Sequence, residues 1–317
     1  MRYVCVRLPV QAPDRADNQV WQTRRCRDGG IRMTYTISPL PHVKSKESVK
    51  SVMWGTVAAL VPITIAAIYL FGLPALTIVL ATVVAAVVTE IVIYKAASQP
   101  ITIRDGNAVL IGLLLALLMP ASVPIWVPII GAAFAIAIPK YIFGGTGTLV
   151  FHPALVGFAF LLAAWPTLMG TVSIPNLGGF SDLLLETGAG RLVEASPALV
   201  LLGGAFVLYK KYVDRRVALS ATILLLLLMP IVGMGSQLPY VITGGYFLGL
   251  IFLAADPITS PVTKKGRLVY GTVLVLLILI QLHFDTYFAG MCFAVLLMNV
   301  FSPFIDRNTI PKPIGGK

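Results

Sequence analysis

Long apolar runs separated by short polar stretches constrain this chain more than any other feature. A helix that spans a bilayer needs about 20 apolar residues, and shorter apolar segments fit inside a helical bundle. Only 12% of the 317 residues are charged and 57% are hydrophobic, whereas soluble domains carry about 25% charged residues. We therefore expect an all-α polytopic membrane protein of about ten transmembrane helices. The segments are residues 51–71, 75–94, 106–119, 123–139, 149–166, 197–209, 217–233, 240–255, 267–283 and 286–302.

Charges in the polar stretches predict how these segments are oriented. Cytoplasmic loops of membrane proteins carry an excess of Lys and Arg. The stretch 167–196 holds Asp182, Glu186 and Glu194 against Arg191 alone, so we place it outside. Basic residues precede the first segment and follow every even-numbered one, which predicts two cytoplasmic termini in a cell-membrane protein. They are Lys44, Lys46, Lys50, Lys95, Arg104, Lys140, Lys210, Lys211, Arg215, Arg216, Lys264, Lys265, Arg267, Arg307 and Lys312. The net charge of +11 is thus explained without a nucleic-acid partner.

Two stretches share their spacing of glycine and proline. "IGLLLALLMPASVP" (111–124) aligns without gaps with "LGLIFLAADPITSP" (248–261). They form the third and eighth segments, so each half holds five helices, and the odd number inverts one half relative to the other. Short segments interrupted by Gly and Pro at matching positions of inverted halves point to a central binding site. The predicted repeats cover residues 33–166 and 197–303, followed by a cytoplasmic tail at 304–317; chance similarity of two apolar runs is the alternative.

Residues 1–32 differ from the remainder in composition. They hold seven arginines and no lysine, whereas the remainder holds eleven lysines and six arginines. They also lack the apolar core of a signal peptide. Met33 opens "MTYTISPLPHVKSKES", which has the character of a natural amphiphilic start. We expect residues 1–32 to be an upstream extension, and a disordered basic tail is the alternative.

Two acidic residues in the first half are candidates for an ion pathway. Ionisable groups at membrane depth are costly and usually face the interior of a bundle. Glu90 lies near the inner end of the second segment, where snorkelling beside Lys95 is the alternative reading. Asp105 precedes the third segment, so it either caps that helix or coordinates an ion at its start.

The second half offers an oxygen-rich break in the chain. Asp256 ends the eighth segment, and Pro257 prevents the helix from continuing without the loss of hydrogen bonds. A carboxylate beside freed carbonyls and the hydroxyls of Thr259 and Ser260 predicts a site for a hard cation such as sodium. A simple helix stop at the cytoplasmic surface is the alternative.

The glycine-rich stretch "FGGTGTLVFHPALVG" (143–157) leads into the fifth segment. Glycines ahead of a helix can cradle a phosphate on backbone N–H groups, which makes Gly144, Gly145, Thr146 and His152 candidate cofactor ligands. The stretch lacks the Lys-Ser/Thr ending of a Walker A loop, and close packing between helices explains the glycines equally well. Three cysteines without a CxxC pair and three histidines predict no iron–sulfur cluster, haem or other metal in this chain.

Several stretches resemble the D subunit of Rnf-type ion-translocating oxidoreductases and the related B subunit of sodium-pumping NADH:quinone oxidoreductase, the NqrB/RnfD family. The resemblance implies ten helices in two inverted repeats. It also implies electron flow through flavins and iron–sulfur centres, largely in partner subunits, coupled to export of sodium or protons. The stretches are "ISPLPHVKSKES" (37–48), "RDGNAVLIGLLLALLMP" (104–120), "GGTGTLVFHPALVGFAF" (144–160), "LLGGAFVLYKK" (201–211), "DPITSPVTKKGRLVYG" (256–271) and "AGMCFAVLLMNVFSPFID" (289–306).

The resemblance also implies FMN linked to a threonine of an S-G-A-T-like motif in the outside loop. No S-G-A-T occurs in this sequence, and "ETGAG" (186–190) places Gly190 at the acceptor position. Thr171 and Thr187 are the remaining acceptors to consider, and we expect this chain to lack the usual covalent FMN or to attach it atypically. Non-covalent FMN or riboflavin stays open. His152 departs from the asparagine common at its position.

The residues leave a second class of function open, a stand-alone secondary transporter or channel, because inverted five-helix repeats also serve solute permeation. A scaffold subunit is a third reading. We expect the chain to act as part of a translocase without independent activity, and the sequence is compatible with sodium and with protons.

Overall fold

The computed structural model describes residues 5–7, 22–28, 31–37, 48–98, 105–145, 147, 149–170, 190–242, 245–284 and 287–310 of the 317-residue chain. The chain divides into two compact units, Met1–Ser48 and Val49–Lys317.

The first unit contains a small antiparallel sheet. Its strands are β1 (Cys5–Arg7), β2 (Gln22–Asp28) and β3 (Ile31–Ile37), in the order β1-β2-β3. Strand β3 pairs along β2 from Ile31 to Ile37 and runs across Met33. These strands lie where the sequence suggested an upstream extension or a disordered tail. The start of translation at Met33 stays a prediction.

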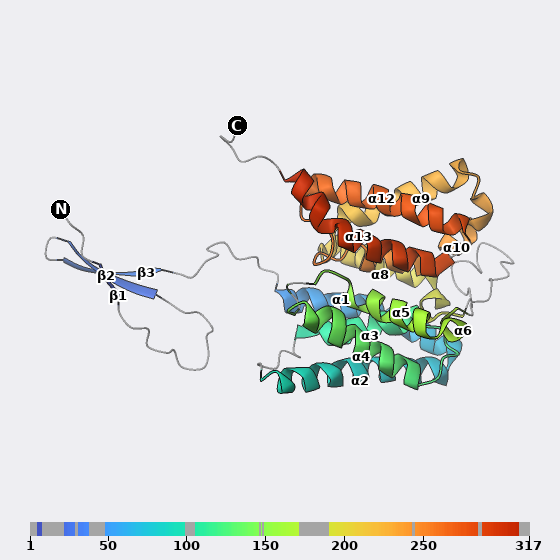
Figure 1. The fold of residues 1–317 in the computed structure, drawn as a ribbon, viewed down its shortest axis with the longest axis horizontal. Coiled ribbons are helices and arrows are strands. Elements are labelled where there is room, and N and C mark those ends of the chain that lie inside the picture. The colour runs from blue at the N-terminus through green and yellow to red at the C-terminus, as the bar shows by residue number, and fades with distance from the viewer. Residues whose placement is uncertain are drawn as a thin grey trace. The chain divides into compact units, whose positions relative to one another are not determined.

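The second unit is helical throughout its described residues (Figure 1). In its first half the chain passes from α helices into one π-helical stretch, η2, that directly continues α4. The elements are α1 (Val49–Phe71), α2 (Leu73–Ala96), α3 (Asn107–Leu118), α4 (Trp126–Ile136), η2 (Ala137–Ile142), α5 (Pro153–Ala164) and α6 (Pro166–Met169).

The second half begins after the stretch 171–189, which lies outside the described residues. It contains a second π-helix, η5, and two short 3-10 helices, η3 and η4. The elements are η3 (Leu192–Ala195), α8 (Pro197–Lys210), α9 (Arg215–Ile231), η4 (Gly235–Gln237), α10 (Leu238–Ile242), α11 (Gly245–Leu248), η5 (Gly249–Leu253), α12 (Lys264–His283) and α13 (Tyr287–Thr309).

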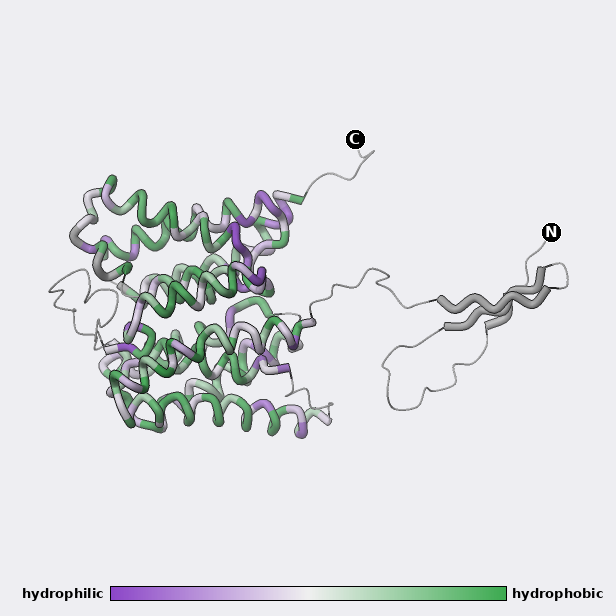
Figure 2. Tube along the Cα trace, turned by 180° about the vertical axis from the view of Figure 1, so that it is seen from behind, coloured by the Kyte–Doolittle hydropathy of each residue, from purple (hydrophilic) through white to green (hydrophobic). Residues whose placement is uncertain are grey.

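The helical unit has the surface of a multi-pass membrane protein. Four of its described helical stretches are long and apolar enough to cross a bilayer: Val49–Phe71, Leu73–Ala96, Lys264–His283 and Phe288–Thr309. Apolar side chains are exposed along them, and Figure 2 shows hydrophobic colouring along the helices with polar colouring concentrated toward their ends. Exposed aliphatic surface of this extent is stable in lipid rather than in water.

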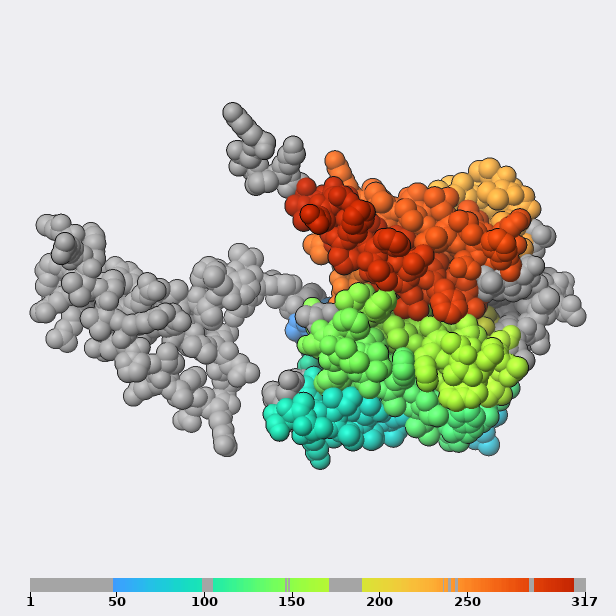
Figure 3. Space-filling model, in the orientation of Figure 1, coloured from blue at the N-terminus to red at the C-terminus, as the bar shows by residue number. Residues whose placement is uncertain are grey.

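The helices of the two halves form two groups, coloured blue to green and yellow to red in Figure 1. Helix α1 contacts α8, and α5 contacts α13, so the groups meet through these pairs. Figure 3 shows the green surface of the first group directly against the orange and red surface of the second.

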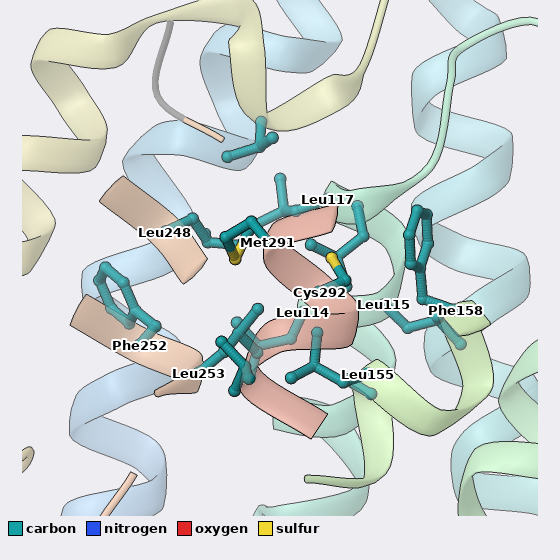
Figure 4. Packing of buried hydrophobic residues seen from close by; sticks show 14 of the residues in the cluster. Leu114, Leu115, Leu117, Leu155, Phe158, Leu248, Phe252, Leu253, Met291 and Cys292 are labelled. Carbon is teal, nitrogen blue, oxygen red and sulfur yellow. The ribbon is translucent and has the colours of Figure 1, made fainter. Parts of the chain in front are cut away.

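An apolar core lies between the two groups. Helices α3 and η5 are short and buried along nearly their whole length. Their side chains converge with residues of α5 and α13, as Figure 4 shows. The labelled residues are Leu114, Leu115, Leu117, Leu155, Phe158, Leu248, Phe252, Leu253, Met291 and Cys292. The space between the two short helices is therefore filled by packed apolar side chains, and the polar groups lie beyond their ends.

Candidate functional site

The chain after η5 forms the oxygen-rich break that the sequence predicts. Thr259 and Ser260 are buried, whereas Asp256 is half-buried. The Thr259 hydroxyl donates to Oδ2 of Asp256 over 3.4 Å, and the Ser260 N–H donates to the Asp256 carbonyl over 3.0 Å. Within the described ranges the Ser260 Oγ has no hydrogen-bond partner. The break thus gathers one carboxylate and two hydroxyls. The hydroxyl of Ser260 is the one that is still able to bind a ligand.

The electrostatics of Asp256 follow from its position just beyond the helix. Burial raises the pKa of this carboxyl to about 6, and hydrogen bonds from the Ile258 backbone and from Thr259 oppose that rise. At neutral pH the group is mostly ionised, so it can neutralise a cation. As the pH falls through about 6 it takes up a proton and loses that ability.

Two charged residues tie the break to neighbouring helices. The Asp214 N–H donates to the Ala255 carbonyl over 2.9 Å, and the Asp214 carboxylate caps α9 by accepting from the N–H groups of Arg216 and Val217. Arg267, in the first turn of α12, donates from Nε to the Pro261 carbonyl over 2.9 Å. The two ends of the break are therefore held by the N-termini of α9 and α12.

Helix α13 supplies the third anchor. Asp306 accepts hydrogen bonds from the N–H groups of Val262 and Thr263 at 3.0 to 3.1 Å, and the hydroxyls of Thr263 and Thr309 contact one another. Sequence reasoning missed Asp214 and Asp306 as parts of this site and treated Arg267 only as a loop charge. Asp214 could have been identified from the sequence as the start of a helix, because aspartate is a preferred N-cap residue and it directly precedes the helical segment.

Glu90 does not snorkel to the surface. Its carboxylate is buried in α2 and lies 2.7 Å from Nζ of Lys140. The sequence placed Lys140 among the cytoplasmic loop charges, and this was wrong: Lys140 lies in η2 with its side chain 1% exposed. A buried lysine is retained because the carboxylate neutralises it.

The two glycines after η2 have a structural role. Gly144 and Gly145 have φ angles of +97° and +105°, a region that favours glycine. Their N–H groups donate to the carbonyls of Tyr141 and Lys140 at 3.1 and 2.8 Å, which closes the end of the helix. Thr146 lies outside the described residues. His152 is the buried N-cap residue of α5, and its Nδ1 has no partner in the described part of the chain.

The remaining first-half candidate, Asp105, does not cap α3. Gly106 is the N-cap residue, with φ +77° and no capping side chain, and Asp105 is exposed. The structure brings Asp256, Thr259 and Ser260 together and joins Glu90 to Lys140, but it shows no contact between those two groups. Thr171 and Thr187 lie outside the described residues.

A further buried polar segment, Arg191–Pro197, lies at the other ends of the short helices. The Leu192 N–H donates to the Met119 carbonyl over 3.1 Å, at the end of α3. The Arg191 guanidinium lies 4.3 Å from the ring centroid of Phe288 and 5.6 Å from that of Phe158. Its Nε and Nη1 have no hydrogen-bond partner among the described residues.

Two polar residues follow Arg191 within this segment, Glu194 and Ser196. Glu194 accepts from the Arg191 N–H over 3.4 Å, and burial raises the pKa of its carboxyl to about 7 although Arg191 lowers it. Ser196 is buried at the N-terminus of α8 and caps it without a side-chain hydrogen bond. Sequence reasoning placed residues 167–196 in an outside loop, counted Arg191 only as its one basic charge and did not propose Arg191 or Ser196 as site residues.

A family model described as the NQR2, RnfD, RnfE family matches residues 36–315, which includes nearly all of the helical unit. The chain belongs to this family. It is 44% identical over 287 residues to the D subunit of an ion-translocating oxidoreductase complex of Methanosarcina acetivorans, covering 89% of this chain and 98% of the relative. The resemblance read from the sequence is thereby confirmed.

Two further relatives of this NQR2/RnfD/RnfE protein are named for different transported ions, protons in one and sodium in the other. It is 35% identical to the D subunit of a proton-translocating ferredoxin:NAD(+) oxidoreductase complex of Clostridium ljungdahlii, over 89% of this chain and 96% of the relative. It is 36% identical to the D subunit of a Na(+)-translocating ferredoxin:NAD(+) oxidoreductase complex of Acetobacterium woodii, with the same coverage. Similarity of this degree therefore favours neither ion.

Proposed function

We propose that this protein is an integral membrane subunit of an Rnf-type redox-driven ion pump. It would couple electron transfer through flavins and iron–sulfur centres to the translocation of sodium or protons. The observation that carries the proposal is similarity to the D subunits of such complexes along 89% of the chain, together with the apolar helical unit. Its partners are the other subunits of the complex, and it acts as part of a translocase in the cell membrane.

The contacts between helices support ten spans in two inverted repeats. In the first half α2 packs against α4 and α4 against α5; at the corresponding places α9 packs against α12 and α12 against α13. Helix α1 contacts the short helix α3, as α8 contacts α11, which leads into η5. Two five-helix units with the same packing order, joined through α1–α8 and α5–α13, are what an internal repeat produces.

The geometry supports an ion pathway that starts on the cytoplasmic side. Lys264 and Lys265 follow the Asp256 break and are exposed, which favours a cytoplasmic position for it. The carboxylate of Asp256 and the hydroxyls of Thr259 and Ser260 are oxygen ligands, the type that hard cations prefer. Glu90 supplies a second carboxylate at membrane depth. We also include the exposed Asp105 in the proposed pathway, as a residue at which the ion could enter.

A redox-driven uptake assay tests this function. Inverted membrane vesicles that carry the whole complex are given reduced electron donor, and charge uptake is followed with a membrane-potential dye. Glu90→Gln and Asp256→Asn are expected to lower uptake per assembled complex at least tenfold, and Asp105→Asn to have a smaller effect. Solute uptake by the purified single chain, without redox partners, would instead support a stand-alone transporter.

A flavin, FMN or riboflavin, is the cofactor that the family implies. Arg191 and Ser196 fit the phosphate of FMN, which riboflavin lacks, because a buried guanidinium with unused donors and the N-terminus of α8 both favour an anion. When bound, the flavin would supply one-electron and two-electron transfer. Arg191 would neutralise the phosphate, and the rings of Phe158 and Phe288 would keep water from the guanidinium.

Covalent attachment can be decided by in-gel flavin fluorescence of the denatured subunit. We expect either no fluorescence or fluorescence that one substitution removes. Ser196→Ala, Thr187→Ala and Thr171→Ala test the three hydroxyls in turn. Fluorescence that survives all three substitutions would contradict attachment at any of them.

A further inference from the structure

Lys140 in η2 and Glu90 in α2 form a buried ion pair. The two residues are 50 positions apart in the sequence. Nζ of Lys140 lies 2.7 Å from Oε1 of Glu90, and the side chains are 1% and 3% exposed. The second carboxylate oxygen, Oε2, is buried and has no hydrogen-bond partner in the described ranges. The carboxylate is therefore neutralised by one ammonium and still has one oxygen available.

The pair lies within the apolar belt of the helical unit. Glu90 belongs to the membrane-span candidate Leu73–Ala96. Val92, nearer to the end of α2, is 58% exposed, and Ile142, beyond Lys140, is 67% exposed. Exposed aliphatic side chains beyond both charges indicate lipid at that depth. A single charge left there without its partner is strongly unfavourable.

The backbone that carries Lys140 is suited to a change of position. It belongs to the π-helix η2, and π-helical turns are rare and occur frequently at functional sites. Pro139, directly before Lys140, has no N–H to donate, and lysine carries its ammonium on a flexible four-carbon stem. The turn at Phe143–Gly144, three and four residues later, is exposed. A lysine on this stretch can therefore move its ammonium between the carboxylate and the end of the helix.

We propose that Lys140 is a tethered counter-cation that exchanges with the transported ion at Glu90. The inference rests on the proposed ion-pump function and adds the residue that controls binding at one of its carboxylates. At rest the ammonium neutralises Glu90. A monovalent cation, sodium or a proton, displaces the ammonium toward the exposed turn and binds the carboxylate; its departure draws the ammonium back. The Glu90 carboxylate therefore has a cation beside it before and after each exchange. The transported ion never has to bind to, or depart from, a carboxylate without another cation to neutralise it.

Replacing Lys140 by arginine tests the exchange. Arginine keeps the positive charge but binds a carboxylate through two parallel hydrogen bonds, which would also occupy Oε2. Lys140→Arg is expected to assemble and to lower redox-driven charge uptake per assembled complex at least tenfold. Uptake is measured in vesicles with a membrane-potential dye, which responds to sodium and to protons alike. Assembly is measured by co-purification of the other subunits.

The matched control is Lys95→Arg, a lysine-to-arginine change at an exposed position on the same helix as Glu90. It is expected to keep uptake within twofold of the unsubstituted complex. If Lys140→Arg also keeps uptake within twofold while Glu90→Gln abolishes it, the exchange is overturned and the ion pathway stands. If Glu90→Gln retains uptake, the pathway through Glu90 is overturned together with the exchange.

A second variant covers the case in which Lys140→Arg does not assemble. Lys140→Gln removes the competing ammonium, so the transported cation would remain bound at Glu90. Uptake per assembled complex is then expected to fall at least tenfold. Uptake at the unsubstituted level in the assembled fraction would show that the pair only stabilises the fold and would overturn the exchange.

Discussion

The Asp214 carboxylate, which caps α9, lies 2.5 Å from Nη1 of Arg267 in the first turn of α12. Under the proposed repeat these are the second and fourth helices of their half, the same pair of helices that Glu90 and Lys140 join in the first half. The two ion pairs differ in burial, because the Arg267 side chain is 27% exposed whereas Lys140 is 1% exposed. The more exposed pair orders a turn, and the buried pair holds charges inside the apolar belt.

Removing one member of the buried pair should destabilise the protein more than removing both. Glu90→Leu removes the carboxylate that neutralises the Lys140 ammonium, and breaking a buried ion pair in this way costs about 3 kcal/mol or more. Glu90→Leu combined with Lys140→Met leaves no charge in the site and is expected to recover most of that loss. The thermal unfolding midpoint of the purified protein in detergent measures both variants. A double variant as unstable as the single one would contradict this account.

Gly145 should resist substitution because of its backbone conformation. Its φ of +105° is unfavourable for any residue with a Cβ, so Gly145→Ala is expected to cost about 1–2 kcal/mol. No atom of the described residues lies within 4 Å of an added Cβ there, so we expect the loss to arise from the backbone rather than from a clash. Gly147→Ala is the control and should be nearly neutral, because an added Cβ there also meets no described atom within 4 Å. Equal unfolding midpoints for the two variants would refute the argument.

The sequence predicted the elements whose cause is local. Runs of apolar residues predict helices, and Pro257 after Asp256 predicts the break, because proline cannot continue the hydrogen-bond pattern. The role of Lys140 could not be predicted in the same way. A lysine at the end of an apolar run has the pattern of a loop charge, and its partner Glu90 lies 50 residues earlier.

The irregular helix at η2 does have a local cause, which sequence reasoning did not use: Pro139 has no N–H to donate and cannot continue a regular α-helix. The buried segment around Arg191 was missed for a different reason. Its composition is that of an exposed loop, and only its contacts with Phe158 and Phe288 reveal that the folded chain encloses it.

Arg267 should contribute to stability through its geometry as well as its charge. Its Nε donates to the Pro261 carbonyl while Nη1 pairs with Asp214, and lysine cannot make both contacts. Arg267→Lys is expected to lower the free energy of unfolding by about 1 kcal/mol, the usual contribution of one hydrogen bond. Arg307→Lys, a conservative change at an exposed position, is the control for the measurement of the unfolding midpoint. An equal effect of the two changes would contradict the role of the Pro261 contact.

Asp256 should make stability depend on pH in a defined direction. Burial raises the pKa of this carboxyl to about 6 in the folded protein, above its ordinary value of about 3.9. A raised pKa means that the stabilisation is complete below about pH 4 and is lost as the pH rises through about 6. Asp256→Asn should therefore be more stable than the unsubstituted protein at pH 7.5, by about 3 kcal/mol.

This advantage should shrink by more than half at pH 4.5, where Asp256 is mostly uncharged in the folded protein. Unfolding midpoints measured at the two pH values in choline buffer, which excludes sodium, test the prediction without interference from a bound ion. Added sodium should then raise the midpoint of the unsubstituted protein at pH 7.5 but not that of Asp256→Asn, if Asp256 binds the ion. A difference in unfolding midpoint that stays constant from pH 4.5 to 7.5 would contradict a raised pKa. Only the titration of Asp256, which asparagine lacks, can make that difference depend on pH.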